Sequence, residues 1–442
     1  MHEWGRGHVY RAWMYSGMSI RMMQSVIAVS AAKTTSTCEQ EIQNRTFWSC
    51  FVIDRLVFSG KDQPLSLPVE SADTHWPVGE QDYAFCAADI QRCPVKRDGN
   101  VVPDTHNTME HVFSIIVRGF EIWTKVHHWI ISGGRRKPEM ASLRNSPWAS
   151  TSVWAGLRRE LQSWRDKQDN RLHYPETHVD VYVSLGKGES FALINLIYYI
   201  SILFLGREYV PFLPAPESAP RGPVDPPLLD GQAPQNWWED RVKELFDAAS
   251  FITGLLRELE DEGAALYTPF AGFCNFSAAT MNVYTHCFPS MNLGRSKESR
   301  SIMEENLEYL DRFRRHWPIG QAWWTTIQQT KTLYEHRSQD PRTYHGKTRD
   351  DFIRLEASIH DVTGRSPSYT GRLRNQISPA EASSVEAEAD TTEIQHSETH
   401  GDDVPNEFLD AFSTTEVWDE NWPLWGEMHS IPFSYNLEAL LQ

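Results

Sequence analysis

The chain has 442 residues, 12 % of them aromatic, which is enough for one large helical domain or for two or three ordinary ones. The formal net charge is −17, but no Lys or Arg follows Arg374, and 15 of the 59 acidic residues lie in 375–442. Residues 1–374 therefore carry 42 basic and 44 acidic side chains, a formal charge of −2. This near-neutral balance excludes a global basic surface for nucleic acid, and phosphate would repel the acidic end.

The cysteines and the apolar runs argue against a disulfide-rich secreted protein and against a membrane-spanning one. Six cysteines are scattered along the sequence, several of them in apolar runs: Cys38, Cys50, Cys86, Cys93, Cys274 and Cys287. They predict an intracellular, reduced protein in which all six act as small buried hydrophobic residues. The longest apolar run, Phe191–Leu205, is shorter than the ~20 residues that span a bilayer, so it predicts a buried core helix.

In chain order, the first predicted elements are two helices joined by a polar link. Residues 1–31 have a broad apolar face at helical spacing, made by Val9, Ala12, Trp13, Ile20, Met23 and Ile27. The link Thr34–Thr37 can cap the second helix, which we expect over residues 39–58. One face of that helix carries Phe47, Cys50, Phe51, Asp54 and Phe58.

Asp54 is the exception on this apolar face. A buried carboxylate without a partner would be costly, so we expect it to meet backbone N–H groups or an Arg. The candidate partners are Arg45, Arg55 and Arg21. Two interpretations of the Asp54-Arg55 pair stay open: an ion pair that orients the helix against its neighbour and the following loop, or part of a small-molecule pocket. We favour the ion pair, because buried charges are usually paired.

After this helix, proline and periodicity divide the chain into a loop and a series of helices. Residues 60–105 contain five prolines and are predicted to be mostly loop. Helices are then predicted over 105–132, 148–170, 190–207, 237–262, 266–290, 299–315 and 320–336. The helix at 190–207 is the most apolar, so we expect it to be central, with Ser190 as its N-cap. Aromatic residues in 109–129, 154–164 and 191–199 line either the core or a ligand cavity, and the core is the favoured interpretation.

Three later segments differ in composition from these helices. Residues 211–236 hold eight of the 25 prolines, which predicts an extended insertion. Residues 337–400 have no periodic apolar face and are predicted to be a flexible linker. Residues 401–442 combine acidic with large apolar residues, so we predict a disordered activation segment that docks on coactivators; packing of 421–441 on the body is the alternative. The candidate contacts are Phe408, Phe412, Trp418, Trp422, Trp425 and Leu437.

The sequence offers no credible catalytic or metal-binding set. It contains no Cys-x₂-Cys pair, and its histidines form no His-Glu-x-x-His motif. Gly186–Ser190 lacks the Gly-Lys-Ser/Thr ending of a phosphate loop, and Gly188–Ala192 lacks the last glycine of a nucleophile elbow. We therefore predict that the chain is not an enzyme and that it holds no cofactor or metal.

Two stretches resemble a known fungal family. One is Arg45-Thr-Phe-Trp-Ser-Cys-Phe-Val-Ile-Asp-Arg55, followed by Gly60-Lys-Asp-Gln-Pro64 and Leu67-Pro68. The other, just before it, is Arg11-Ala-Trp-Met-Tyr-Ser-Gly-Met-Ser-Ile-Arg-Met-Met-Gln24. In residue types, order and spacing they resemble the fungal-specific transcription factor domain, which is the middle homology region of fungal binuclear zinc-cluster regulators.

The resemblance implies an all-α fold, with a single large regulatory domain of paired antiparallel helices over residues 1–336. It marks six structural residues of the family motif: Arg45, Trp48, Asp54, Arg55, Pro64 and Pro68. In that family the helix at 9–31 lies well inside the domain, so the resemblance also implies a chain truncated at its N-terminus. Zinc is then expected only in a missing N-terminal cluster, and we expect no direct DNA binding by this chain.

By the same resemblance, the chain is the regulatory and activation part of a nuclear transcription factor that acts with RNA polymerase II. The helical body would sense an effector or inhibit the tail, and the tail would contact coactivator or mediator-type proteins. A homo- or heterodimer and a small-molecule effector are further expected partners; a membrane is not. The alternative is a paralogue without DNA contact that pairs with or titrates a full regulator, and an all-α enzyme ranks last.

Overall fold

The computed structural model describes residues 1–30, 36–58, 65–67, 74–86, 93–95, 106–210, 220, 222–223 and 227–339. They belong to one compact unit, Met1–Arg349, and none of them lies in the second unit, Asp350–Gln442. Several predictions therefore fall outside the described residues. These are the acidic segment 401–442, nearly all of the linker 337–400, half of the insertion 211–236, and Pro64 and Pro68.

The prediction of an all-α fold is confirmed. No strand occurs in the described ranges, although His75 and Pro94 form an isolated antiparallel bridge between two loop segments. The predicted core helix α8 (Gly188–Arg207) is long and apolar enough to cross a membrane by length and composition. However, 78 % of its apolar window is buried in the protein, which is the property of a core helix.

The N-terminal part consists of α1 (His2–Gly5), α2 (Val9–Ser30) and α3 (Thr37–Phe58). Ser36 and Glu39 form a capping box at the start of α3. The Ser36 hydroxyl accepts from the Glu39 N–H at 3.2 Å, and the Ser36 N–H donates to the Glu39 carboxylate at 2.8 Å. The polar link thus caps the helix as expected.

Most of the later helices match the predicted ranges within a few residues. They are α5 (Val112–Ile131), α6 (Val153–Asp166), α8, α9 (Trp237–Asp261), α10 (Pro269–Cys287), α11 (Ser296–His316) and α12 (Ile319–Ser338). Two short helices were not predicted, α4 (Glu80–Ala84) within the loop and α7 (Val179–Ser184) before α8. The expected cap at Ser190 is wrong, because Gly186 turns the chain at φ +67° and α8 already begins at Gly188.

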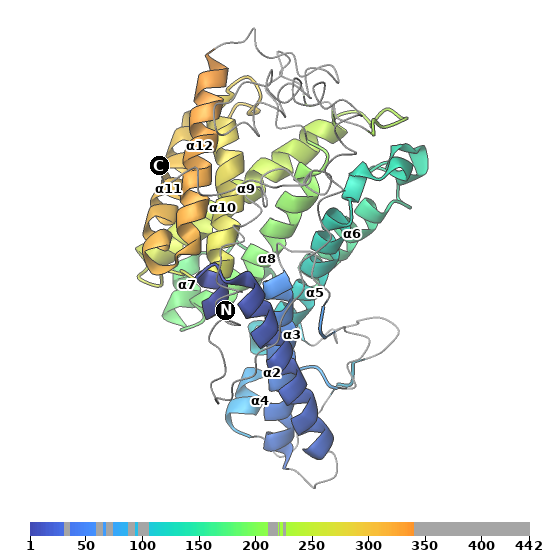
Figure 1. The fold of residues 1–442 in the computed structure, drawn as a ribbon, viewed down its shortest axis with the longest axis vertical. Helices are drawn as coiled ribbons and strands as arrows, with labels where there is room; N and C mark the ends of the chain where they lie inside the picture. The colour runs from blue at the N-terminus through green and yellow to red at the C-terminus, as the bar shows by residue number, and fades with distance from the viewer. Residues whose placement is uncertain are drawn as a thin grey trace, which may run out of the picture. The chain divides into compact units, whose positions relative to one another are not determined.

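Helix α10 lies at the centre of the larger group of helices, where it packs against α8, α9, α11 and α12 (Figure 1). Every residue of α10 except His286 is buried. Small side chains allow this close packing: a Cβ added at Gly272 would lie 2.3 Å from the ring of Phe313 on α11. Helix α8 packs between α9 and α5, so the predicted central helix shares the core with α10.

A buried amide network joins α9, α10 and α11. The Asn306 amide N–H₂ donates to Asn275 Oδ1 at 2.7 Å and to Thr253 Oγ1 at 2.9 Å, and its carbonyl accepts from Asn282 at 2.6 Å. Asn275 and Asn306 are fully buried, and Asn282 and Thr253 are nearly so. The polar groups satisfy one another, which is how buried amides avoid the cost of losing water.

The expectation that all six cysteines are buried and unpaired is wrong. Cys38 at the start of α3 and Cys86 just after α4 form a disulfide, with Cα atoms 5.3 Å apart, and Cys86 is exposed. Cys50, Cys274 and Cys287 are buried thiols, as predicted, and Cys93 is a half-buried one. The two cysteines are 48 residues apart, and no local pattern in the sequence predicts that they form a disulfide.

Candidate functional site on helix α3

Asp54 and Arg55 hold the loop that follows α3. The Asp54 carboxylate accepts hydrogen bonds from the backbone N–H groups of Ser66 and Leu67, both at 3.0 Å. Arg55 donates to the Leu67 carbonyl at 3.0 Å and lies 3.8 Å from Asp54, and its guanidinium stacks on the Phe51 ring at 3.1 Å. Of the three predicted partners of Asp54, the structure supplies Arg55 together with the backbone N–H groups.

Asp54 and Arg55 are each 2 % exposed, so their charges lie inside the protein. Burial raises the pKa of the Asp54 carboxyl, while the two backbone N–H groups and the Arg55 charge oppose that rise. The pair therefore stabilises the fold mainly by satisfying groups that are already buried. Removing either partner would leave the other uncompensated.

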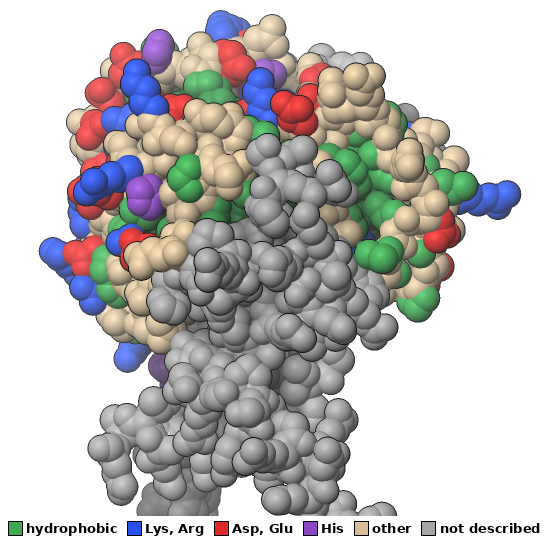
Figure 2. All heavy atoms as spheres, turned by 90° about the horizontal axis from the view of Figure 1, so that it is seen from above, with side chains coloured by type: hydrophobic (Ala, Val, Ile, Leu, Met, Phe, Trp, Pro, Cys, Tyr) green, Lys and Arg blue, Asp and Glu red, His purple; other side chains and the backbone are tan. Residues whose placement is uncertain are grey.

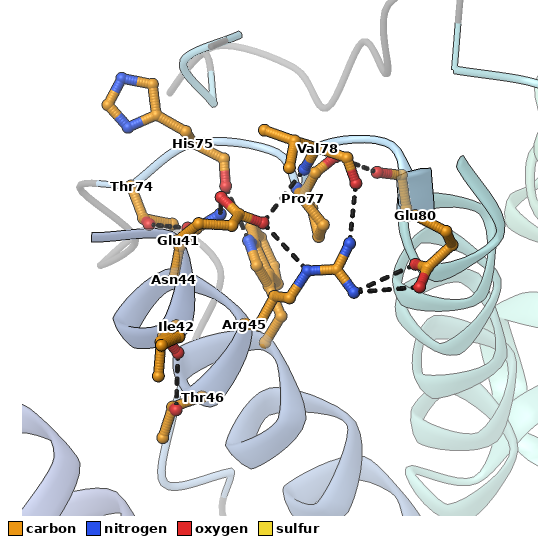
Figure 3. A network of polar contacts seen from close by, with 12 residues as sticks. Glu41, Ile42, Asn44, Arg45, Thr46, Thr74, His75, Pro77, Val78 and Glu80 are labelled. Atoms are coloured by element: carbon orange, nitrogen blue, oxygen red, sulfur yellow. Dashed lines mark hydrogen bonds and ion pairs between the residues drawn. The ribbon is translucent and has the colours of Figure 1, made fainter. Parts of the chain in front are cut away.

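Arg45, nearer the start of α3, attaches the helix to a second part of the loop (Figure 3). Its guanidinium donates to Glu41 at 3.1 Å, to the Val78 carbonyl at 2.9 Å and to Glu80 at 3.1 Å. Glu41 also accepts from the Val78 N–H at 3.2 Å, and Arg45 lies over the Tyr83 ring at 4.0 Å. Arg45 thus joins α3 to the start of α4 and does not serve Asp54.

Trp48 lies between these two attachments and is fully buried. Its indole N–H donates to the His75 carbonyl at 2.7 Å, and its ring stacks on Trp76 with centroids 5.2 Å apart and an angle of 2° between planes. Phe47 and Phe51 meet the same ring edge-on. We call Arg45, Trp48, Asp54 and Arg55, with loop segments 65–67 and 75–80, the α3 clamp.

The geometry of the α3 clamp favours a structural role. Its carboxylates and guanidinium groups point to backbone groups of the neighbouring loop. Within the described ranges, no group of three or more His, Cys, Asp or Glu side chains could hold a metal ion. The role of the four clamp residues as the family's structural motif stays a prediction, as does that of Pro64 and Pro68, which lie outside the described residues.

The predicted aromatic positions on α5, α6 and α8 lie in the core. Trp123 of α5 packs edge-on against Phe204 of α8, and Trp154 of α6 packs against Tyr209. All four are buried, which agrees with the core interpretation. Sequence reasoning did not find Glu41 and Glu80, the two carboxylates that accept from Arg45. The four-residue spacing of Glu41 and Arg45 on a helix could have suggested one of the two contacts.

Comparison with known proteins finds a family model and several fungal regulators that are similar to this chain. Residues 1–166 match the model of the fungal specific transcription factor domain. An uncharacterized transcriptional regulatory protein of Schizosaccharomyces pombe is 23 % identical over 356 residues, which cover 73 % of this chain and 49 % of that protein. No solved structure matches the chain.

Relatives from a second fungus are named as Zn(2)-C6 fungal-type transcription factors. The Zn(2)-C6 fungal-type transcription factor FTF1c of Fusarium oxysporum f. sp. lycopersici is 23 % identical over 355 residues, covering 76 % of this chain and 35 % of that protein. The transcription factor FTF2 of the same fungus is 23 % identical over 354 residues, covering 76 % and 31 %. The chain thus spans half or less of the length of these relatives. Residues 1–166, which contain the whole α3 clamp, match the model of the fungal specific transcription factor domain family.

Proposed function

We propose that this chain is the regulatory portion of a fungal zinc-cluster-type transcription factor, acting in the nucleus on RNA polymerase II transcription. The match of residues 1–166 to the fungal specific transcription factor domain carries the proposal. The relatives named as Zn(2)-C6 transcription factors support it over about three quarters of the chain.

Within this proposal, the helical body and the acidic segment 401–442 have different tasks. The body serves as a scaffold that responds to a small-molecule effector or a protein partner. The acidic segment contacts coactivators, because its acidic residues keep Trp418, Trp422 and Trp425 in water until a hydrophobic groove receives them. Neither task requires catalysis.

A second part of the proposal is that DNA contact and zinc binding belong to a cluster outside this sequence. The sequence holds no Cys-x₂-Cys pair. On the face shown in Figure 2, basic and acidic side chains are interspersed over the described surface. A mobility-shift titration of the chain at several salt concentrations tests this point, and tight, strongly salt-dependent binding to duplex DNA would contradict it.

A reporter assay tests the function as a whole. The full chain is fused to an unrelated DNA-binding domain, and reporter output is compared with a fusion lacking 401–442 and with a fusion carrying Trp418→Ala, Trp422→Ala and Trp425→Ala. A matched control carries Thr391→Ala, Thr392→Ala and Ser397→Ala. We expect the full fusion to change reporter output, and the Trp variants, unlike the control, to lose that change. A full fusion with no effect on the reporter contradicts the proposal.

A second candidate is a paralogue that pairs with a full zinc-cluster regulator and titrates it. Under this alternative the fusion is silent alone, but added chain reduces the activity of a co-expressed regulator. Imaging a fluorescently tagged chain complements both tests, because either function requires entry into the nucleus.

A further inference from the structure

The Cys38–Cys86 disulfide closes a loop that contains the whole α3 clamp. Its two cysteines are 48 residues apart, and all four clamp residues and both loop segments that they hold lie between them. The bond joins the first turn of α3 to the residue two positions beyond the end of α4. It therefore links α3 to α4 covalently, at the end of α4 opposite to the contact of Arg45 with Glu80.

The two sulfur atoms of the bond lie in different surroundings. Cys86 is exposed, so a small thiol in solution can reach its Sγ atom. Cys38 is half-buried in the first turn of α3, where the N–H groups of the helix stabilise a thiolate. The acidic residue of that turn, Glu39, accepts hydrogen bonds from Ser36, which offset part of its charge. Attack at Cys86 with Cys38 as the leaving group is thus the favoured direction.

The other four cysteines are poor sites for the same chemistry. Burial raises the pKa of the Cys50, Cys274 and Cys287 thiols, that of Cys287 to about 12, so these thiols stay protonated and unreactive near pH 7. Cys93 is half-buried and packs against the apolar cluster of α2 and α3. One disulfide beside four such thiols fits a redox-sensing pair, whereas a disulfide scaffold pairs most of its cysteines.

Helix α4 has few other contacts to hold it in place. It has five residues, none of them buried, and a helix of that length is not stable by itself. Arg45 binds Glu80 at its start and lies over the ring of Tyr83 at 4.0 Å. Next to the disulfide, Phe85 is 84 % exposed and adds little packing. The second half of α4 therefore depends on the disulfide for its order.

The backbone at Cys86 shows how cleavage would reach the helix. Its φ is +48°, in the left-handed region that residues other than glycine rarely adopt, and the bond to Cys38 constrains it. The Cys86 N–H donates to the Tyr83 carbonyl at 3.2 Å, and the Phe85 N–H donates to the Gln81 carbonyl at 3.0 Å. When Cys86 returns to an ordinary conformation, these last hydrogen bonds of α4 open with it.

We propose that Cys38 and Cys86 form a reversible thiol–disulfide switch, which exchanges with a low-molecular-weight thiol of the glutathione class and controls the order of α4. The oxidised form holds α4 on α3. The reduced form releases the second half of α4, while Arg45 still holds its start. This proposal does not depend on the function proposed above.

Reduction of the switch takes two exchange steps. The thiolate of one glutathione attacks the Cys86 Sγ atom, and the bond between Cys86 and Cys38 breaks with its electron pair on the Cys38 sulfur. A second glutathione thiolate attacks the glutathione sulfur of this mixed disulfide and releases the Cys86 thiolate. The products are one glutathione disulfide and two protein thiols, which take up the two protons that the glutathione thiols gave. Oxidation by glutathione disulfide is the reverse.

A redox titration of the full chain tests the exchange. The chain is equilibrated at a series of ratios of glutathione to glutathione disulfide, quenched with acid, alkylated and mapped by mass spectrometry. We expect one transition of the Cys38–Cys86 pair, with the same midpoint from the oxidised and from the reduced chain, while Cys93 stays a thiol. A bond that survives every excess of glutathione, or one that does not form again from the reduced chain, overturns the proposal.

Hydrogen exchange of residues 80–86 tests the effect on α4. We expect these amides to exchange at least ~10-fold faster in the reduced chain than in the oxidised one, while α10 exchanges equally slowly in both and shows that the core stays folded. Cys38→Ser should exchange fast in either condition. Cys93→Ser is the matched control and should respond to reduction like the unchanged chain. Equal exchange of 80–86 in the oxidised and reduced chain overturns the control of α4, whatever the variants do.

Discussion

Asp54 and Arg55 hold the same loop residue, Leu67, by its two opposite backbone groups. The Asp54 carboxylate accepts from the Leu67 N–H at 3.0 Å, and the Arg55 guanidinium donates to the Leu67 carbonyl at 3.0 Å. Because both side chains leave the same turn of α3, they fix the direction of the loop as well as its position. The pair therefore fixes the two peptide units on either side of the Leu67 Cα, which a single contact could not do.

Loss of the Asp54 carboxylate is expected to destabilise the fold strongly. Asp54→Ala leaves two loop N–H groups without an acceptor and the buried Arg55 without its counter-charge, so the free energy of unfolding should fall by about 3 kcal/mol. Urea denaturation measures this change. Asp311→Ala serves as the control, because its ion pairs with Arg314 and Arg315 lie at the surface, where solvent screens them, and their loss should change stability much less. Equal effects of the two substitutions would contradict the buried role of Asp54.

His106 is expected to make stability depend on pH. Burial, reinforced by the neighbouring His111, lowers the pKa of His106 to about 4. Between about pH 6.5 and pH 4 the unfolded chain binds this proton and the folded chain does not, so stability falls as the pH falls through that window. The loss at about pH 5 relative to about pH 7 should reach up to ~2 kcal/mol from this group.

His106→Phe tests this pH dependence, because a phenyl ring can keep the stacking on His111, whose ring centroid lies 4.1 Å away, but cannot titrate. Urea denaturation at both pH values should give a smaller difference for this variant than for the unchanged chain. The exposed His178 supplies a control, and His178→Phe should leave the difference as it is. An unchanged difference in His106→Phe would show that other groups cause the acid loss.

The Cys38–Cys86 disulfide is expected to stabilise the N-terminal part only under oxidising conditions. Its two cysteines are 48 residues apart, and in the chain-entropy model closing such a loop contributes about 4 kcal/mol. Without reductant, Cys38→Ser should lower the free energy of unfolding by up to that amount. With reductant the unchanged chain and the variant should become nearly equal.

Peptide mapping of the unreduced chain checks the linkage itself. We expect one disulfide-linked pair of peptides, containing Cys38 and Cys86. Cys93→Ser is the control for the stability measurement, because Cys93 is a free thiol and its loss should not respond to reductant. Full alkylation of Cys38 and Cys86 in the unreduced, denatured chain would rule out the bond.

Asn306 is expected to be among the least replaceable residues of the helical core. Asn306→Leu removes the donor and the acceptor that Asn275, Asn282 and Thr253 use, so several buried polar groups lose their partners at once. The cost should be about 3–5 kcal/mol in urea denaturation. Lys297→Leu places the same side chain on the exposed surface of the same helix and should change stability by less than about 0.5 kcal/mol. A small effect of Asn306→Leu would mean that water replaces the network.

The sequence alone predicted those features that depend on a local pattern of residues. The spacing of Phe47, Phe51 and Asp54 predicts both the helix and the need for a partner to the carboxylate, and the structure supplies that partner within the next loop. The sequence could not assign Arg45, because Glu80 approaches it from 35 residues away and loop geometry leaves no periodic signal. The same limit explains why the pairing of Cys38 with Cys86 was not foreseen.

The amino-acid composition of α10 did not predict that this helix lies at the centre of the core. Asn275, Ser277 and Asn282 suggest a helix with a wet face, whereas α8 has an almost continuous apolar sequence. The structure buries Asn275 and Asn282 because their amides are satisfied across helices, and such pairing depends on neighbours that are distant in sequence. Apolar content alone therefore identified one of the two central helices.

The α3 clamp predicts which substitutions the family can accept. The helix contributes side chains to it, but at Ser66, Leu67, His75 and Val78 the loop contributes main-chain atoms. Substitution at these loop positions leaves those hydrogen bonds intact, apart from proline at 66, 67 or 78, which has no N–H to donate. In an alignment of the family, we therefore expect Arg45, Asp54 and Arg55 to be constant, the buried positions 67 and 78 to stay apolar, and proline to be excluded from 66, 67 and 78.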